Sequence, residues 1–524
     1  MKVNNWKKVV CGGTGALMIV LTGCESVGGL DVNKALVNQY AVKSAESQES
    51  LKFELLTGDL AGLPPEAQKL VGLFKEVTIK FTEEKIQDPR NASMKGEFTY
   101  GKGSIPFELS LQNEDIIIRI EGVSKPIYIR NAQTGPLNGG LLVPGQKSIQ
   151  ELQKVLEDKL PTLASFFIGH APNPKTIGVT SVSEKVNNET VSLQKLHAEI
   201  KGSEALGLVK TFLQNIAADE KGLKEFLGTV FDVFGPIAKE AAEQSGEENK
   251  LLDAYLSNKT LAVETMYTAV QSGLKDVLAS YDETTDKLVN GPGNEPIRDI
   301  LSDRSSVNVD LYVDSSQQIR KSSAGITIPL PEAETGLKGI KLSATGERWN
   351  INQPVTINPV KAEGDRFVFD AADPESVPSL GSFLKSVDKN SSIYKLLKED
   401  LQITKRSFTL SLDDEDMSLF GFGGYRKGDV SMVPVTYVAN MLDAKVKWDG
   451  ETKQITVTDD LGGHTIVFTL GSAEALVDGK PVKLEQAVEL HGDYTNVPLR
   501  FLAEALGGEV KWDSEQDAVI ITRQ

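Results

Sequence analysis

The chain has 524 residues, of which 40% are hydrophobic and 25% are charged, and this composition is typical of globular proteins rather than disordered ones. Its formal net charge is −17, and removal of the three lysines within residues 1–23 would leave −20 on the remainder. This net negative charge disfavours binding to nucleic acid or to an anionic membrane surface, because both require a basic patch. The only cysteines are Cys11 and Cys24, so the residues after Cys24 can form neither a disulfide nor a thiolate metal site.

Residues 1–23 have the features of a secretory signal peptide. A basic start is followed by an apolar run, residues 9–21, that is too short to span a bilayer comfortably. The run ends in Leu21, Thr22 and Gly23, directly before Cys24. This tetrad resembles the bacterial lipobox. The resemblance implies cleavage before Cys24, a diacylglyceryl group on its sulfur, and a chain anchored to the extracytoplasmic face of the cell membrane.

Residues 24–50 are predicted to form a lipidated tether that runs into the start of a first helix. Residues 51–370 are predicted to form an α+β body. Several segments alternate apolar and polar residues with a period of two, which is typical of half-buried strands, and short turns between them predict an antiparallel meander. These segments are residues 77–82, 94–100, 105–111, 116–120, 127–129, 191–200, 307–313 and 340–342.

A helical block is predicted at about residues 204–300, inserted between strands of one sheet. Ser203 is expected to open its first helix and Asp219 its second, because both residue types favour the N-cap position. Apolar residues then recur at helical spacing, as in Leu206, Val209 and Leu213. The sequence therefore predicts an antiparallel, half-barrel-like sheet with a helical insertion.

Four segments near the end of the body are similar to the closing strands of half-barrel lipoprotein carriers, a group that includes the periplasmic lipoprotein chaperone. They are Leu311-Tyr312-Val313-Asp314, Ile319-Arg320-Lys321, Ser343-Ala344-Thr345-Gly346-Glu347 and Asn350 to Ile357. The resemblance implies an apolar cavity for acyl chains between sheet and helices. A filled core without a cavity is the alternative, and the sequence does not decide between them.

A proline- and glycine-containing segment, residues 371–404, is predicted to be a linker. The following residues, 405–524, contain an internal repeat with a constant offset of 64 residues. Met432 to Ala439 aligns with Asn496 to Ala503, and Val446-Lys447-Trp448-Asp449 aligns with Val510-Lys511-Trp512-Asp513. Each repeat is predicted to be one helix followed by a strand hairpin, so the module is a small α+β domain of two related repeats.

Turn and cap residues support this interpretation of the repeats. Pro434 and Pro498 are expected in the first turn of a helix, where the missing N–H costs nothing. Gly507 is expected to end the second helix, and the Asp478-Gly479 pair is typical of a tight hairpin. Trp448 and Trp512 are predicted to be core residues, with stacking on sugars as the alternative.

The pattern Val-Pro-Leu-Arg-Phe-Leu-Ala-Glu-Ala-Leu-Gly at residues 497–507, followed by Val-x-Trp-Asp, closely resembles the copper amine oxidase N-terminal-like domain, also called the stalk domain. The first repeat departs from it at Thr436, Asn440 and Asp443. The resemblance implies an adhesive or spacing role at a cell surface. It does not imply oxidase chemistry, because the sequence contains neither an Asn-Tyr dipeptide nor a His-x-His pair.

Catalytic signatures are missing from the sequence. There is no His-Glu-x-x-His, Gly-x-Ser-x-Gly or phosphate-loop motif, and the four histidines lack the spacing of metal ligands. No catalytic residue, metal site or cofactor is therefore predicted. The predicted function is a non-enzymatic envelope scaffold that contacts cell wall or carbohydrate through residues 405–524, and the alternative is a carrier of lipid or another apolar ligand in the body.

Overall fold

The computed structural model describes residues 27–113, 115–130, 146–245, 250–361, 363–370, 378–412, 423–513 and 518–523, with backbone alone at 146–154, 156–157, 240–245 and 250–253. These residues divide into two compact units. The body contains nearly all residues before 363, and the C-terminal unit contains the residues from 373 onward. Within the described ranges, no helix combines the length and the apolar content that a membrane crossing requires.

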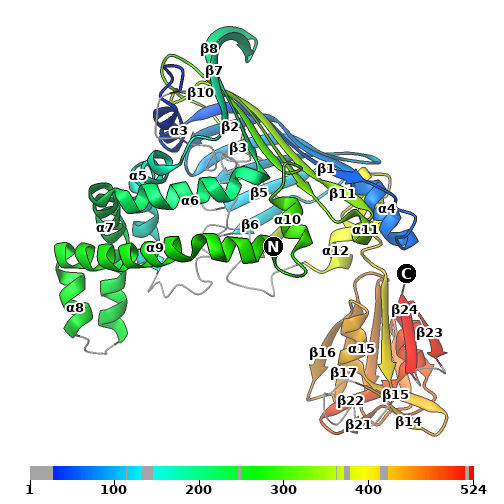
Figure 1. Ribbon diagram of the computed structural model, residues 1–524. Helices are drawn as coiled ribbons and strands as arrows, with labels where there is room; N and C mark the ends of the chain where they lie inside the picture. The colour runs from blue at the N-terminus through cyan, green and yellow to red at the C-terminus, as the bar shows by residue number, and fades with distance from the viewer. Residues whose placement is uncertain are drawn as a thin grey trace. The chain divides into compact units, whose positions relative to one another are not determined.

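The body is built on one curved sheet of twelve strands (Figure 1), in the order β12-β6-β5-β4-β3-β2-β1-β11-β10-β9-β8-β7. Every pairing given for it is antiparallel. The strands are β1 (Ala45–Thr57), β2 (Glu76–Asp88), β3 (Asn91–Tyr100), β4 (Gly103–Gln112), β5 (Asp115–Ile120), β6 (Ile127–Arg130), β7 (Thr176–Val186), β8 (Glu189–Lys201), β9 (Ser306–Val313), β10 (Ile319–Pro329), β11 (Leu337–Trp349) and β12 (Phe367–Asp370).

A helical insertion separates β8 from β9 along the chain, and β1 pairs with β11, so the last long strand of the body lies beside the first. The insertion consists of α6 (Gly202–Ala218), α7 (Glu220–Ser245), α8 (Lys250–Ser257), α9 (Lys259–Asn290) and α10 (Glu295–Ile300). The remaining body helices are α3 (Val32–Tyr40), α4 (Pro65–Phe74), α5 (Gln146–His170) and α11 (Glu332–Thr335). The predicted α+β class, with a half-barrel-like antiparallel sheet and a helical insertion, is confirmed.

The two predicted helix starts have different outcomes. Asp219 caps α7, because its Oδ1 accepts a hydrogen bond of 2.8 Å from the backbone N–H of Gly222. The prediction that Ser203 opens α6 is wrong, since the N-cap is Lys201 and Ser203 already lies in the first turn. The helix begins directly where β8 ends. The Glu204 carboxylate accepts a hydrogen bond of 3.0 Å from the backbone N–H of Lys201, as in a capping box, so Ser203 has no capping role.

The two faces of the body sheet have different coverings. On one face, the Ser93 and Ser110 hydroxyls accept backbone N–H groups of Asn358 at 2.9 Å and Val360 at 3.1 Å, so the segment after β11 lies across β3 and β4. Helices α3 and α5 lie on the other face, where Leu36 and Ile168 share a buried core with Ala324 and other sheet residues. This second face is the one that the predicted carrier function concerns.

Residues 378–412, which include part of the predicted linker, contain regular structure. They form α12 (Leu380–Lys385), α13 (Ser392–Tyr394), η3 (Lys395–Asp400) and β13 (Arg406–Ser411). Ile393 and Leu396 are buried, and Gly381 lies so close to the backbone of Asp460 that a Cβ at this position would clash with it. The segment differs from a free linker because these apolar residues and this close approach fix it within the C-terminal unit.

The C-terminal unit contains three small antiparallel sheets around one core. Their orders are β13-β24-β23, β14-β15-β22-β21 and β16-β17-β18-β19-β20. The elements are β14 (Tyr425–Lys427), β15 (Val430–Pro434), α15 (Val435–Met441), β16 (Lys445–Asp449), β17 (Gln454–Asp459), β18 (His464–Thr469), β19 (Glu474–Val477), β20 (Lys480–Lys483), β21 (Glu489–His491), β22 (Tyr494–Pro498), α16 (Leu499–Ala505), β23 (Gly508–Asp513) and β24 (Ala518–Arg523).

The sequence repeat becomes an approximate two-fold relation within this unit. β15 pairs antiparallel with β22, and Val433 lies opposite Val497, its own counterpart 64 residues later. Each repeat continues into a helix and a hairpin, β16–β17 or β23–β24. The hairpin of the second repeat pairs with β13, which precedes the first repeat in the chain. The predicted helix-and-hairpin repeats are therefore confirmed.

The helix ends and the hairpin turn follow their turn chemistry. Gly507 has φ +73° after α16, and its counterpart Asp443 has φ +60° after α15. An aspartate rarely adopts this left-handed conformation, but here Arg406 Nη2 donates a hydrogen bond of 3.0 Å to its Oδ1. Asp478 and Gly479 also have positive φ values, +50° and +78°, between the paired strands β19 and β20.

Candidate functional site

A row of apolar side chains lines the face of the body sheet that carries α3 and α5. Facing residues of antiparallel strands project to the same side of a sheet. We call this surface the apolar face and define it by two registers. The first crosses Phe98, Ile79, Leu51, Ala344 and Ala324, and the second crosses Phe53, Leu342 and Ile326.

The helices cover the apolar face unevenly. Ala324 and Val309 are buried beside Leu36 of α3 and Ile168 of α5. At the β1–β11 part of the same face, Leu342 is 38% exposed and Phe53 is only partly buried. A row of apolar residues is thus buried where helices lie on it and remains in contact with solvent farther along.

The helices of the body also expose large apolar side chains. Among the described side chains of α5 and the helical insertion, eight are 39–48% exposed: Leu160, Phe167, Val209, Phe234, Leu261, Val277, Leu288 and Ile300. The described helices form a small core of their own around Ile216, Leu223 and Leu227. Scattered exposed leucines are ordinary on a soluble protein, but this number in one helical insertion and its neighbour α5 is typical of a binding surface.

An open pocket of about 430 Å³ lies at one end of β1. Leu55, Leu56, Lys75 and Glu76 contribute to its lining. Leu55 lies opposite Ile340 and follows Leu51 and Phe53 in the alternation of β1, so it belongs to the apolar face. The pocket therefore adjoins the less covered part of the apolar face. Its lining includes the charged residues Lys75 and Glu76.

Two buried carboxyl groups interrupt the apolar face near α3. Glu49 on β1 and Glu84 on β2 are 5% and 1% exposed. Ser47 lies opposite both Glu84 and Arg348 in the register, and its hydroxyl donates to Glu84 Oε2 at 2.6 Å. The guanidinium of Arg348 is 4.0 Å from Glu49 Oε1, which is too long for a strong ion pair.

Burial dominates the ionisation of this pair. It raises the pKa of Glu49 to about 8, with a further increase from the neighbouring Glu84 charge and a partial offset from Arg348. It raises the pKa of Glu84 to about 7, against the lowering effects of the Ser47 hydrogen bond and of Arg348. Sequence analysis missed both residues. One feature of the sequence could have indicated Glu49. It occupies an inward-facing position of the alternating strand β1, where the other inward-facing residues are small or apolar: Ala45, Ser47, Leu51 and Phe53.

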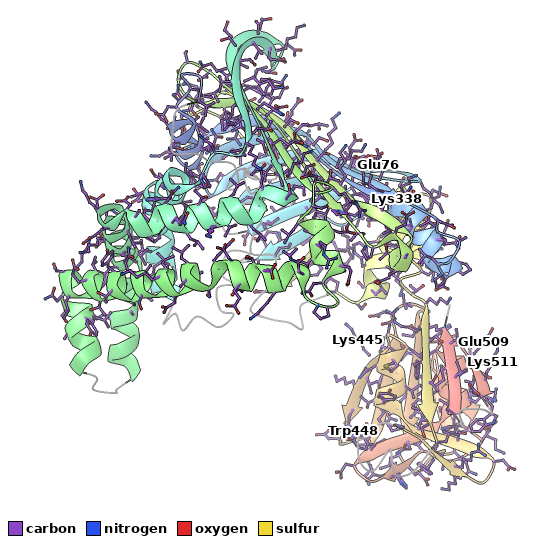
Figure 2. All side chains as sticks on the ribbon, in the orientation of Figure 1. Glu76, Lys338, Lys445, Trp448, Glu509 and Lys511 are labelled. Carbon is purple, nitrogen blue, oxygen red and sulfur yellow. The ribbon has the colours of Figure 1, made fainter. Side chains whose placement is uncertain are left out.

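The prediction that Trp448 and Trp512 are core residues is wrong, because they are 49% and 45% exposed. Trp448 lies opposite the buried Ile455, and Trp512 lies opposite the buried Val519. The alternation of apolar and polar residues therefore places both rings on the core-facing side of their strands. However, β16 and β23 are edge strands of their sheets, where the core no longer covers a large side chain. Figure 2 shows Trp448 at the surface of the unit, on the same strand as Lys445.

The surroundings of the two tryptophans differ although the repeats are related. The guanidinium of Arg426, on β14, lies 4.6 Å from the centre of the Trp512 ring, within cation–π range. The counterpart of Arg426 in the other repeat is Leu490, which is 60% exposed. Trp512 is therefore partly covered by a cation from the first repeat, whereas the second repeat has the uncharged Leu490 at the position equivalent to Arg426.

The histidines form local contacts rather than a shared centre. His170, His197 and His464 each lie 2.7–3.1 Å from one aspartate oxygen, of Asp219, Asp310 and Asp478 respectively. His491 stacks on Tyr425, with ring centres 4.3 Å apart. Over the residues that the structure describes, no group of three or more His, Cys, Asp or Glu side chains could hold a metal ion.

The predicted lipid-attachment residue Cys24, with Leu21, Thr22 and Gly23, lies outside the described residues. The helix α3, which begins at Val32, follows these residues closely in the chain.

Comparison with known proteins gives a family match within the C-terminal unit. None of the curated proteins compared with this chain matches it. Residues 413–521 match the sequence model of the family described as copper amine oxidase N-terminal domain. This is a non-catalytic domain, so the match is compatible with a chain that is not an enzyme. The match supports the stalk-type domain predicted for residues 405–524, and the C-terminal unit is accordingly similar to copper amine oxidase N-terminal domains.

Proposed function

We propose that this chain is a non-catalytic binding protein of the cell envelope, tethered through a lipid on Cys24, whose body carries an apolar ligand such as an acyl chain. The observation that supports the proposal is the uneven cover of the apolar face. Leu342 and Phe53 remain accessible on a surface that is buried around Ala324 and Ala344. A ligand with apolar chains would bury this area and the exposed helical side chains, which is favourable by about 25 cal/mol for each Å² removed from water.

The carrier function predicts co-purification of a lipid. The test is native mass spectrometry of the full chain after residue 23 with Cys24→Ser, purified from bacterial cells without detergent. We expect additional mass in the lipid range that organic solvent releases. The variant Leu342→Asp should lose most of this mass, because an ionised carboxylate on the apolar face would be costly to bury against an acyl chain.

A matched control is Leu476→Asp, which changes a leucine of similar exposure (37%) in the C-terminal unit. It should retain the bound mass of the parent chain. A parent chain without additional mass, or equal loss of lipid in both variants, would contradict the carrier function and would favour a body that serves only as a structural support.

A second function concerns the C-terminal unit, which we propose contacts cell-wall polymer or carbohydrate. It is supported by the exposure of Trp448, since large exposed aromatic rings are a common means of contact with partner molecules. The two-fold related position of Trp512 would offer a repetitive polymer a second contact and increase the avidity.

Retention of the Cys24→Ser chain on purified peptidoglycan tests this second function. Trp448→Ala should weaken binding at least about tenfold, as expected for loss of an aromatic hot spot. Trp512→Ala should weaken it less, because Arg426 already covers that ring. Leu476→Ala serves as the control for a lost exposed side chain. No retention of the parent chain would exclude this contact, and equal weakening by all three variants would argue against the tryptophans.

A further inference from the structure

The helix α3 is fixed to the body sheet at two places. Leu30, just before the helix, and Val32, Ala35 and Leu36 within it are buried in the core that includes Ala324. At its C-terminal end the contacts are polar: Asn38 Nδ2 donates to the carbonyl oxygen of Gln317 at 2.9 Å. Gln39 Oε1 accepts a hydrogen bond of 2.9 Å from Arg348 Nη1.

Arg348 therefore belongs to two groups at once. One of its nitrogens serves Gln39 of α3, and another lies 4.0 Å from Glu49, which interacts with Glu84. Glu84 Oε1 is buried without a hydrogen-bond partner, and so is Gln39 Nε2. A neutral carboxyl group tolerates this arrangement, whereas a buried carboxylate with an unpaired oxygen requires a counter-charge.

The polar groups around the pair come from five elements. β1 contributes Ser47 and Glu49, and β2 contributes Glu84, which faces Met94 of β3. β11 contributes Arg348, which among the described residues is the one cation that acts on the two carboxyl groups. α3 contributes the uncharged Gln39 and the adjacent Tyr40, and β10 contributes Arg320, which donates to the Arg348 carbonyl and pairs with Asp314.

We propose that Glu49, Glu84 and Arg348 form a protonation-controlled latch that holds the C-terminal end of α3 on the apolar face. With both carboxyl groups neutral, Arg348 binds Gln39 and the helix stays docked. Ionisation of the pair draws the guanidinium toward the carboxylates, removes the hydrogen bond to Gln39 and weakens the docking of α3. Release of α3 would uncover the part of the apolar face around Ala324. The latch depends only on the geometry of the body and operates with or without a bound ligand.

The direction of the effect follows from the raised pKa of both carboxyl groups, about 8 for Glu49 and about 7 for Glu84. The pair is neutral in mildly acidic solution and becomes charged between pH 6 and 9. The latch should therefore be closed below this range and loosened above it, a pH window in which an isolated exposed glutamate does not titrate.

Hydrogen–deuterium exchange on the full Cys24→Ser chain tests the latch at pH 5.5 and pH 8.5, with rates corrected for intrinsic exchange. We expect the protection of the α3 amides to fall roughly tenfold or more between these values, since a difference of one in pKa corresponds to a tenfold change in equilibrium. Protection of the amides of β3 and β4 should change less. In the double variant Glu49→Gln/Glu84→Gln, α3 should keep its low-pH protection at both values.

Two further variants separate the latch from general effects. In Gln39→Ala, α3 should have the same low protection at both pH values, because the contact that the latch controls is missing at either pH. Glu76→Gln, an exposed glutamate of the same strand β2 paired with Lys52, should behave like the parent chain. The latch is refuted if α3 protection in the parent chain does not depend on pH, or if the dependence persists in the double glutamine variant.

Discussion

Replacement of Arg523 by methionine should destabilise the C-terminal unit by about 3–5 kcal/mol, the effect expected when one partner of a buried ion pair is removed. Arg523 Nη2 donates to both carboxylate oxygens of Asp459 at 2.8 and 2.7 Å, and the two side chains are 7% and 1% exposed. Nη1 donates to the Leu442 carbonyl at 2.6 Å. The substitution would leave a buried carboxylate without its counter-charge and a buried carbonyl without its donor.

The measurement is urea unfolding of the full chain, followed by the fluorescence of Trp448 and Trp512. A companion substitution, Asp459→Asn, should restore part of the stability to Arg523→Met, because it removes the uncompensated charge. Arg500→Met is the matched surface control, since Arg500 pairs with Glu504 in solvent and such pairs contribute about 0.5 kcal/mol. Equal effects of Arg523→Met and Arg500→Met would contradict the role of the buried pair.

The position of this ion pair explains why its loss is expected to cost so much stability. Asp459 ends the hairpin of the first repeat and Arg523 ends that of the second, and the two residues are counterparts at the 64-residue offset. The related repeats have thus diverged to opposite charges at the point where they meet. The pair joins the two halves directly, in addition to the apolar core that they share.

The second large effect is a fall in the stability of the body as pH rises from 5 to 8. Burial raises the pKa of Glu49 to about 8 and of Glu84 to about 7, from 4.5. Between pH 4.5 and these values the folded chain binds more protons than the unfolded chain, so the free energy of unfolding decreases with increasing pH. The stabilisation is fully present below pH 4.5 and is lost above about pH 8. A pKa that differs by one between the folded and unfolded chain corresponds to about 1.4 kcal/mol, so the decrease in the free energy of unfolding should exceed about 1.4 kcal/mol.

Urea unfolding midpoints at pH 5, 6, 7 and 8 measure this dependence through the fluorescence of Trp349, the body tryptophan on β11. The Glu49→Gln/Glu84→Gln chain should have nearly constant midpoints and should exceed the parent chain at pH 8. Glu76→Gln should keep the slope of the parent chain. A parent midpoint that rises with pH would show that the two carboxyl groups are ionised in the folded state, contrary to their burial.

Much of the architecture could be predicted from the sequence, because it depends on local patterns. The period-two alternation of residues 105–111 and 307–313 coincides with β4 and β9, and helical spacing located the insertion between strands. The constant offset of 64 residues predicted two equal units, and positive φ values at Gly507 and Asp478 followed from turn chemistry. These features require only the neighbours of each residue along the chain.

Other properties were decided only by the tertiary structure. The alternation placed Trp448 on the core side of its strand, but the edge position of β16 left the ring exposed. Asp443 adopts a glycine-like backbone conformation because Arg406, 37 residues earlier, binds its carboxylate. Glu49 and Glu84 lie far apart in the sequence, and only strand pairing brings them together under α3 with Arg348. Sequence patterns specify which side of a helix or strand is apolar. The exposure and the charge pairing of a side chain depend on which distant segments pack against that side, and only long-range contacts determine which segments these are.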